Sequence, residues 1–242
     1  MPKTILITRP KHQAQRLSHL IEAIGGKVLL FPTITIIPAE IPTQTIKAAN
    51  TADVIIFVSA NAVEHSITSI RLQVLDKILI AIGPGTARAL AAHHLTHVHI
   101  PSVYNSEGVI ALLSERALLN KDIMIISGEN PREHLEQTLS EQGASVTIMT
   151  CYRRECPIVD KATLRALQSE SIDAIVTTSQ EGLRNLYEIW SAEREWLCAE
   201  PLVVISLDMA IQAQQYGFKQ VWVADNATDE AIMKTLKYHI FT

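Results

Sequence analysis

Hydrophobic positions along the chain follow two patterns that alternate. Short apolar runs rich in β-branched residues, such as residues 4–8 (TILIT) and 53–59 (DVIIFVS), are typical of buried strands. Residues 14–24 (AQRLSHLIEAI) follow the first run, and their apolar side chains lie three and four positions apart, which predicts a helix. A glycine pair, Gly25 and Gly26, ends that helix. Strands that alternate with helices predict βαβ units and parallel sheets covered by helices on both faces.

The alternation continues to the end of the chain. Further strands are predicted at residues 27–37, 77–83, 97–101, 122–127, 143–152, 173–179, 201–206 and 220–224. Further helices are predicted at residues 60–67, 85–94, 106–119, 131–142, 181–190, 208–217 and 228–239. The sequence therefore predicts an α/β fold with parallel sheets flanked by helices.

The two halves of the chain also resemble each other. Residues 53–59 (DVIIFVS) match residues 173–179 (DAIVTTS), so Ser59 corresponds to Ser179. Two half-chains of one topology are the simplest account of this repeat. Chance similarity is the alternative, because βα units share a generic pattern.

Two proline-containing segments mark where the chain is expected to pass between domains. These predicted linkers lie near residues 32–42 (PTITIIPAEIP) and 151–157 (CYRRECP), where proline stops regular strand pairing. A simple division into two consecutive halves would cut the chain near residues 119–121, where the sequence shows only a plain short loop. We therefore predict two lobes between which the chain crosses twice, with the cleft between the lobes as the binding site. The predicted lobes are residues 1–36 with 157–242, and residues 37–153.

Composition narrows the class of protein. Of the 242 residues, 48% are hydrophobic and 19% are charged, as in ordinary soluble globular proteins. The net charge of -4 argues against a general nucleic-acid binder. The start of the chain lacks the features of a secretory signal, and no apolar run is long enough to span a bilayer, so a cytoplasmic protein without membrane contact is expected. The three cysteines form no disulfide or zinc pattern.

Several predicted strands end in a small hydroxyl or glycine residue directly before a helix. The loop from Gly83 to Thr86 (GPGT) is one example, and it lacks the lysine of a phosphate-binding P-loop. Ligands of open α/β sheets bind at the carboxyl ends of the strands, so these turns predict a site for carboxylates. Each turn taken alone is also explained by an ordinary helix N-cap. The candidate substrate-binding residues are Thr8, Arg9, Ser59, Asn61, Ala62, Gly83, Thr86, Ser127, Gly128, Arg132, Ser179 and Ser206.

Two arginines and one tyrosine have side chains that can bind a carboxylate or donate a proton. Arg9 and Arg132 lie at or just after a strand end, where a guanidinium can bind a carboxylate, and solvated surface arginines are the alternative. Tyr152 is expected in the linker rather than in a strand core, with its phenol reaching the cleft, and a tyrosine that packs over the hinge is the alternative. The histidines of residues 93–99 straddle a helix end and a strand, so ordinary surface histidines are favoured over a metal site.

Five segments in order resemble the uroporphyrinogen-III synthase family, and they cover nearly the whole chain. They are ILITRP, DVIIFVSANAV, AIGPGTARAL, ISGENPREHLEQTLSEQGASV before CYRR, and ISLDMAIQAQQYGF before VADNATDEAIMKTL. The resemblance implies two similar flavodoxin-like lobes, each a parallel sheet flanked by helices, joined by a two-stranded linker. It also implies a substrate, hydroxymethylbilane, which is a linear tetrapyrrole with an acetate and a propionate on each ring.

The implied activity is that of a cyclising hydro-lyase of porphyrin and haem biosynthesis. It dehydrates and cyclises the substrate to uroporphyrinogen III, with inversion of ring D through a spiro intermediate and without a metal or organic cofactor. By resemblance, Tyr152 matches the family's cleft tyrosine, so it is the candidate acid for the departing hydroxyl. A monomer is expected, and a direct handover of the substrate from hydroxymethylbilane synthase is a further expectation.

Two other classes of protein remain open on the residues alone. A non-catalytic two-lobed binding protein for a small polycarboxylate ligand has the same organisation, and turnover of the bilane distinguishes it. A receiver-like module would need an acidic cluster at its strand ends, whereas Asp53 and Asp173 lie at strand starts.

Overall fold

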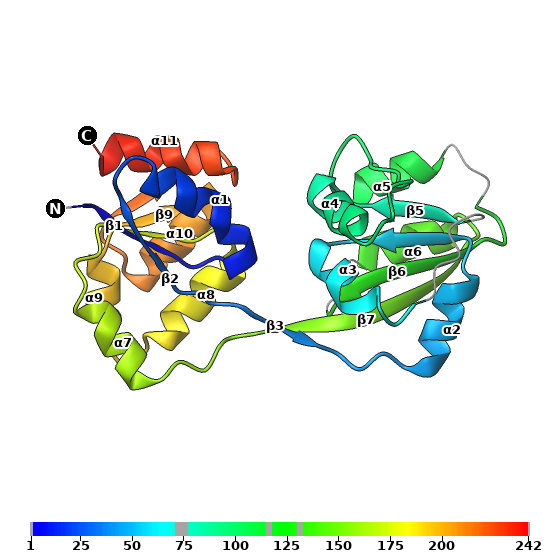
Figure 1. Ribbon diagram of the computed structural model, residues 1–242, viewed down its shortest axis with the longest axis horizontal. Helices are drawn as coiled ribbons and strands as arrows, with labels where there is room; N and C mark the ends of the chain where they lie inside the picture. The colour runs from blue at the N-terminus through cyan, green and yellow to red at the C-terminus, as the bar shows by residue number, and fades with distance from the viewer. Residues whose placement is uncertain (1, 71–76, 115–117, 130–132, 242) are drawn as a thin grey trace. The chain divides into compact units, whose positions relative to one another are not determined.

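Two five-stranded sheets organise the chain, one in each of two units (Figure 1). The computed structural model describes residues 2–70, 77–114, 118–129 and 133–241. Unit 1 comprises Met1–Thr35 with Glu155–Thr242, and unit 2 comprises Ile36–Arg154. The chain therefore leaves unit 1 once and returns to it once, and each unit is described by itself.

The sheet of unit 1 has the strand order β10-β9-β8-β1-β2. Counted along the unit, this is the order 2-1-3-4-5 of flavodoxin-like folds. All four neighbouring pairs are parallel, and Ile5 of β1 lies opposite Ala174 of β8. The elements of unit 1 are β1 (Thr4–Ile7), α1 (Lys11–Glu22), β2 (Lys27–Leu30), α7 (Lys161–Gln168), β8 (Ala174–Val176), α8 (Gln180–Ile189), α9 (Arg194–Ala199), β9 (Leu202–Val204), α10 (Leu207–Tyr216), β10 (Val221–Val223) and α11 (Asp229–His239).

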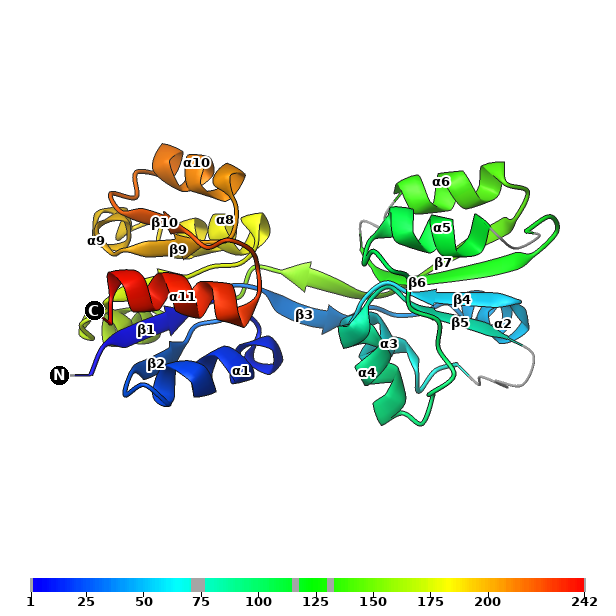
Figure 2. The ribbon, with the colours of Figure 1, turned by 90° about the horizontal axis from the view of Figure 1, so that it is seen from above.

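Two hydrophobic clusters cover the two faces of this sheet. On one face, Leu17 of α1 and Leu236 of α11 pack with Ile5 of β1. On the other face, Leu186 of α8 packs with Leu6 of β1, in a cluster that α7, α9 and α10 also join. Neighbouring residues of β1 thus point to opposite clusters, as expected of a parallel strand buried on both faces. Figure 2 shows the helices on the two sides of the sheet.

The sheet of unit 2 has the order β3-β7-β6-β4-β5. The pairs β4–β5, β4–β6 and β6–β7 are parallel. The elements of unit 2 are β3 (Thr35–Pro38), α2 (Thr43–Thr51), β4 (Val54–Phe57), α3 (Ala60–Ser66), β5 (Ile78–Ala81), α4 (Pro84–Ala92), α5 (Ser106–Ser114), β6 (Asp122–Gly128), α6 (Glu133–Glu141) and β7 (Ser145–Glu155).

Unit 2 has the same layered core. Val63 of α3 and Leu90 of α4 pack with Phe57 of β4 on one face of the sheet. Leu139 of α6 packs with Ile56 of β4 on the other face, where α5 also contributes. These clusters confirm the predicted α/β fold with parallel sheets flanked by helices.

Segments that match across the two halves of the sequence occupy the same place in their sheets. Strand β4 lies between β5 and β6, and β8 lies between β9 and β1. Ser59 after β4 and Ser179 after β8 both cap the next helix. The two units therefore present comparable strand-to-helix turns, which gives matched positions for comparing variants.

Several elements differ from the sequence prediction. Helices α2, α7 and α9 were not predicted, and the predicted strand at residues 97–101 forms a single bridge between His99 and Ile80. Residues 32–42 contain β3, which lies beside β7 at the edge of the sheet, and the Ala39 N–H donates to the Cys151 carbonyl at 3.0 Å. An edge strand tolerates proline, because one side of its backbone needs no partner strand.

Candidate active site

The carboxyl ends of β4, β6 and β7 bring together four of the predicted residues of unit 2. From β4 the chain passes through α3 to β5 on one side, while β6 lies on the other side. Open α/β sheets bind their ligands where the strand order reverses in this way. The residues at this edge are Ser59 after β4, Ser127 and Gly128 on β6, and Tyr152 on β7.

Tyr152 lies inside strand β7, so the expectation of a tyrosine outside a strand core is wrong. Its side chain is buried, with 2% exposed. The register shifts between Ser127 and Gly128, and Gly128 pairs with Tyr152, which leaves Cys151 as an extra residue in the ladder. Such a bulge turns the next side chain to the same face of the sheet. Cys151 and Tyr152 consequently both join the cluster that packs against α3.

The Tyr152 hydroxyl pairs with the hydroxyl of Ser59. The two oxygens, Oη and Oγ, are 3.1 Å apart, and either can be the donor. Ser59 Oγ also accepts the Ala62 N–H at 3.0 Å and so caps α3. A serine hydroxyl has one proton and two acceptor sites, so when Tyr152 is the donor, Ser59 keeps its own proton for a second partner. The pair can therefore pass a proton between Tyr152 and a group bound beside Ser59.

Gly128 provides the space that the Tyr152 ring occupies. A Cβ at this position would lie 2.6 Å from ring carbon Cε2 of Tyr152, a distance that real Cβ atoms do not adopt. The Glu129 N–H holds the same strand pair together by donating to the Tyr152 carbonyl at 2.9 Å. The position of the Tyr152 ring thus depends on a glycine, which has no side chain, at position 128 of the neighbouring strand.

Two nitrogen-bearing side chains lie close to the Tyr152 ring. The ring centroid of His65, on α3, is 5.9 Å from that of Tyr152, and the guanidinium carbon of Arg154 is 6.0 Å from it. A cation near an aromatic face is attracted by the negative charge density of the ring. The sequence analysis did not select His65, and only the packing of α3 reveals its position.

Cys151 takes no part in this chemistry as a nucleophile. Its buried sulfur lies 3.5 Å from the Ala62 carbonyl oxygen and 3.4 Å from that of Ser127, so the single S–H proton has an acceptor on either side. Burial raises the pKa of the Cys151 thiol to about 12. The thiol consequently stays protonated at neutral pH, whereas a nucleophile must be a thiolate.

The remaining candidates of unit 2 are placed differently. Gly83 caps α4, and a Cβ there would lie 3.3 Å from Tyr104. Thr86 is buried in the first turn of α4, and Asn61 is partly exposed in the first turn of α3. The N–H of Ala62 already binds Ser59, so it is not offered to a ligand. Arg132, predicted to bind a carboxylate, lies outside the described residues.

In unit 1 the predicted hydroxyls bind their own backbone. Thr8 Oγ1 donates to the Val176 carbonyl at 3.0 Å and ties the ends of β1 and β8 together. Ser179 Oγ accepts the N–H of Gly182 at 2.9 Å, and Ser206 Oγ accepts the N–H of Met209 at 3.3 Å. Each of these serines acts as an N-cap, the alternative that the sequence left open.

Arg9 is held within unit 1 by three partners. Its Nη1 lies 2.5 Å from the Asp229 carboxylate, and its Nε and Nη2 donate to Thr178 Oγ1 at 3.1 Å and to the Ala227 carbonyl at 2.9 Å. The side chains of Arg9 and Asp229 are only 9% and 14% exposed. The ion pair therefore joins the end of β1 to the first turn of α11.

A buried hydroxyl that the sequence analysis did not select lies at the same edge of unit 1. Thr177 Oγ1 is fully buried at the end of β8, and it is among the buried polar atoms of the described residues that have no hydrogen-bond partner. A Cβ on Gly182 would lie 3.3 Å from this oxygen and 2.9 Å from Ser179 Oγ. The absence of a side chain at Gly182 thus leaves room for the two hydroxyls.

The matched caps Ser59 and Ser179 allow a direct test of the tyrosine contact. Ser179→Ala removes a cap alone and is expected to cost about 1 kcal/mol of stability. Ser59→Ala also leaves the buried hydroxyl of Tyr152 without its partner, so we expect a loss of about 2 kcal/mol. Urea unfolding, monitored by far-ultraviolet circular dichroism, measures the loss of stability in both variants. Ser59→Thr, which keeps a hydroxyl, is the control. Equal losses of stability in the two alanine variants would show that the contact between Ser59 and Tyr152 does not stabilise the fold.

Two properties of the described residues concern membranes and metals. No helix in these parts of the chain is both long enough and apolar enough to cross a membrane. The same residues contain no group of three or more histidine, cysteine, aspartate or glutamate side chains placed to hold a metal ion.

Known proteins resemble the chain over most of its length. The family model described as uroporphyrinogen-III synthase HemD matches residues 15–234. The uroporphyrinogen-III synthase of Salmonella typhimurium is 29% identical over 246 residues, which cover 97% of this chain and all of that protein. The protein of the same name from Escherichia coli is 28% identical over 249 residues, with the same coverage.

Solved structures resemble the fold. Uroporphyrinogen-III synthetase from Helicobacter pylori superposes with a TM-score of 0.60 at 17% identity and 97% coverage of both chains. A mutant uroporphyrinogen III synthase from Thermus thermophilus superposes with a TM-score of 0.55 at 19% identity and 96% coverage of both chains. The structural likeness supports the α/β fold. The family match includes every described strand except β1, which lies before residue 15. Because the family model spans most of the sequence, the chain belongs to the uroporphyrinogen-III synthase family.

Proposed function

We propose that the protein is a uroporphyrinogen-III synthase, a cyclising hydro-lyase. It dehydrates hydroxymethylbilane and closes the ring to uroporphyrinogen III, with inversion of ring D through a spiro intermediate. The match of the family model to residues 15–234 carries this proposal. The hydroxyl pair of Ser59 and Tyr152 is the chemical feature of the described residues that suits the first step.

The first step of the proposed reaction needs an acid. The bond between the hydroxymethyl carbon and its oxygen breaks, the oxygen takes the proton of the acid and leaves as water, and the pyrrole electron pair stabilises the remaining cation, a protonated azafulvene. Tyr152 supplies the proton, and Ser59 passes it on, because the Tyr152 side chain is buried and Ser59 is partly exposed beside it. The proton lost when the macrocycle closes returns to the same pair.

The later steps depend mainly on geometry. The terminal ring attacks through its substituted carbon, and the spiro intermediate then fragments and closes again with that ring inverted. A protein favours this route by holding the flexible chain in one folded pose. We propose that substrate carboxylates bind the loop from Gly83 to Thr86 and the turn at Asn61, where backbone N–H groups begin helices.

The organisation of the chain fits this proposal. Units 1 and 2 are proposed to act as the two similar lobes of the family, joined by a two-stranded linker where the chain crosses after Thr35 and after Arg154. A monomer, a cytoplasmic location and a handover of the substrate from hydroxymethylbilane synthase are part of the proposal.

The isomer produced from hydroxymethylbilane tests the function. Purified protein is added to freshly made hydroxymethylbilane, the products are oxidised, and the uroporphyrin isomers are separated by chromatography. We expect isomer III to dominate, since closure without protein gives isomer I. Isomer I alone, formed at the rate of the protein-free control, would leave the non-catalytic binding protein for a polycarboxylate as the function.

Removing one hydroxyl tests the proposed acid. Tyr152→Phe is expected to lower kcat by about tenfold to a hundredfold with little change in KM, because the phenol acts on the leaving group while positioning is retained. Ser59→Ala is expected to have a similar effect, and the double variant to be no slower than either, since both groups serve one proton path. Tyr238→Phe, which removes an exposed phenol on α11, is the control. Unchanged turnover in Tyr152→Phe would exclude the tyrosine as the acid.

A further inference from the structure

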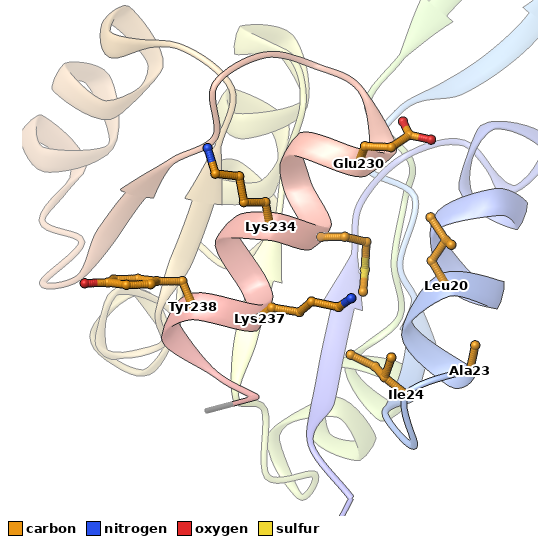
Figure 3. Close-up of a pocket in the computed structure, with 8 residues that line it drawn as sticks. Leu20, Ala23, Ile24, Glu230, Lys234, Lys237 and Tyr238 are labelled. Carbon is orange, nitrogen blue, oxygen red and sulfur yellow. The ribbon is translucent and has the colours of Figure 1, made fainter.

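A groove on unit 1 lies outside the residues assigned to the reaction (Figure 3). It has a volume of about 710 Å³, within the range of small-molecule sites. Leu20, Ala23 and Ile24 line it from the last turn of α1 and the residues after it, and Met233 lines it from α11. Ile24 is 38% exposed, so this apolar surface is open to solvent.

The charged residues of the groove differ in whether they have partners. Glu230 forms an ion pair with Arg16, and Lys234 Nζ lies 2.7 Å from the Asp225 carboxylate. Among the described residues, no carboxylate forms a salt bridge with Lys237. Figure 3 shows the Lys237 side chain extending from α11 toward α1, whereas Lys234 extends to the other side of α11. The groove therefore combines an apolar floor with one ammonium group, that of Lys237, for which the described part of the chain supplies no salt-bridge partner.

The length of the groove limits what can occupy it. The lining residues of α11 between Glu230 and Lys237 span about 10 Å at 1.5 Å per residue. A docked helix makes contacts over about two turns with several apolar anchors on each side. Here the α1 side offers a single turn, which suits a short apolar chain better than a helix. One cation likewise suits one anionic group better than a polycarboxylate.

We propose that this groove binds an amphipathic monocarboxylate, with its apolar chain on Leu20, Ile24 and Met233 and its carboxylate on Lys237. Burial of the chain supplies most of the affinity, because apolar area removed from water is the main favourable term. The lysine selects the sign of the head group, since its flexible stem can follow the chain while its ammonium remains in solvent. The site is separate from the strand ends to which the reaction is assigned.

Calorimetric titration of the full-length protein with decanoate and with decyltrimethylammonium tests the site. We expect decanoate to bind and the cation of equal chain length to bind at least about fivefold more weakly, as one exposed charge contact allows. Lys237→Ala should weaken decanoate binding by about fivefold. Lys234→Ala is the matched control, because it removes the same charge from α11 at a lysine that points away from α1 and already has Asp225 as its partner, and it should change the affinity less than twofold.

A further variant tests the apolar floor. Ile24→Gln replaces a partly exposed side chain, so the fold is expected to persist, and decanoate should bind several-fold more weakly. Equal binding of the two head groups, equal losses in the two lysine variants, or no binding below the micelle concentration would each overturn the proposal. A dimer in sedimentation that Ile24→Gln dissociates would assign the groove to a second copy of the chain instead. The isomer assay of the same variants keeps this outcome separate from the proposed reaction.

Discussion

Replacing Arg9 by methionine is expected to lower the free energy of unfolding of unit 1 by about 3 kcal/mol. Methionine keeps much of the length of the side chain but leaves the Asp229 carboxylate, only 14% exposed, without its cation. Removing one partner of a buried ion pair costs about 3–5 kcal/mol. The lower end applies because Asp229 lies in the first turn of α11, where the helix dipole favours a negative charge.

The tryptophans make this effect measurable for unit 1 alone. All three of them, Trp190, Trp196 and Trp222, belong to that unit, so the tryptophan fluorescence during urea unfolding reports on unit 1. Arg16→Met is the control, because Arg16 and its partner Glu230 are both mostly exposed and such a pair contributes about 0–1 kcal/mol. If Arg9→Met unfolds at the same urea concentration as Arg16→Met but loses activity, Arg9 binds substrate rather than α11.

Gly128→Ala is expected to reduce both stability and turnover. The new Cβ would lie 2.6 Å from the Tyr152 ring, so the ring must move away from Ser59. Overpacking of this kind costs about 1–3 kcal/mol. Because the displaced phenol no longer meets Ser59, kcat should fall about as far as in Tyr152→Phe.

A second substitution separates the clash from other effects of the alanine. In the background of Tyr152→Leu, the ring is absent and Gly128→Ala should cost less than it does in the native protein. Gly85→Ala is a control for stability, since a Cβ there meets only an Arg88 nitrogen at 4.0 Å and alanine favours a helix more than glycine. A loss in stability that is the same with tyrosine and leucine at position 152 would contradict the packing argument.

Much of the fold can be predicted from the spacing of hydrophobic residues. The run at residues 4–8 and the helical spacing after it correspond to β1 and α1, because a buried strand and a one-sided helix each need a fixed apolar pattern. The short helices are harder to predict. Helix α9, for example, has six residues, Arg194–Ala199, too few for a clear repeat of the helical period.

The candidate site is less predictable, because its hydrogen bonds depend on distant residues. Local sequence identifies Ser59 at a strand end, but it does not reveal that the Ser59 hydroxyl meets Tyr152. The partner of Arg9, Asp229, is even more remote in sequence. The bulge at Cys151 is invisible to the alternating pattern, since both it and Tyr152 are hydrophobic enough for either face of the sheet.

The division of the chain has a consequence for its synthesis on the ribosome. Unit 2 is one continuous segment and can be complete while most of unit 1 is still to be made. Strand β1 must wait for its neighbour β8, and at about 5–20 residues per second this delay is roughly 10–30 s. During this time one edge of β1 has no partner strand, and the apolar run from Ile5 to Ile7 is open to wrong pairing. The nascent N-terminal segment is therefore the part of this protein for which the speed of translation and protection by chaperones matter most.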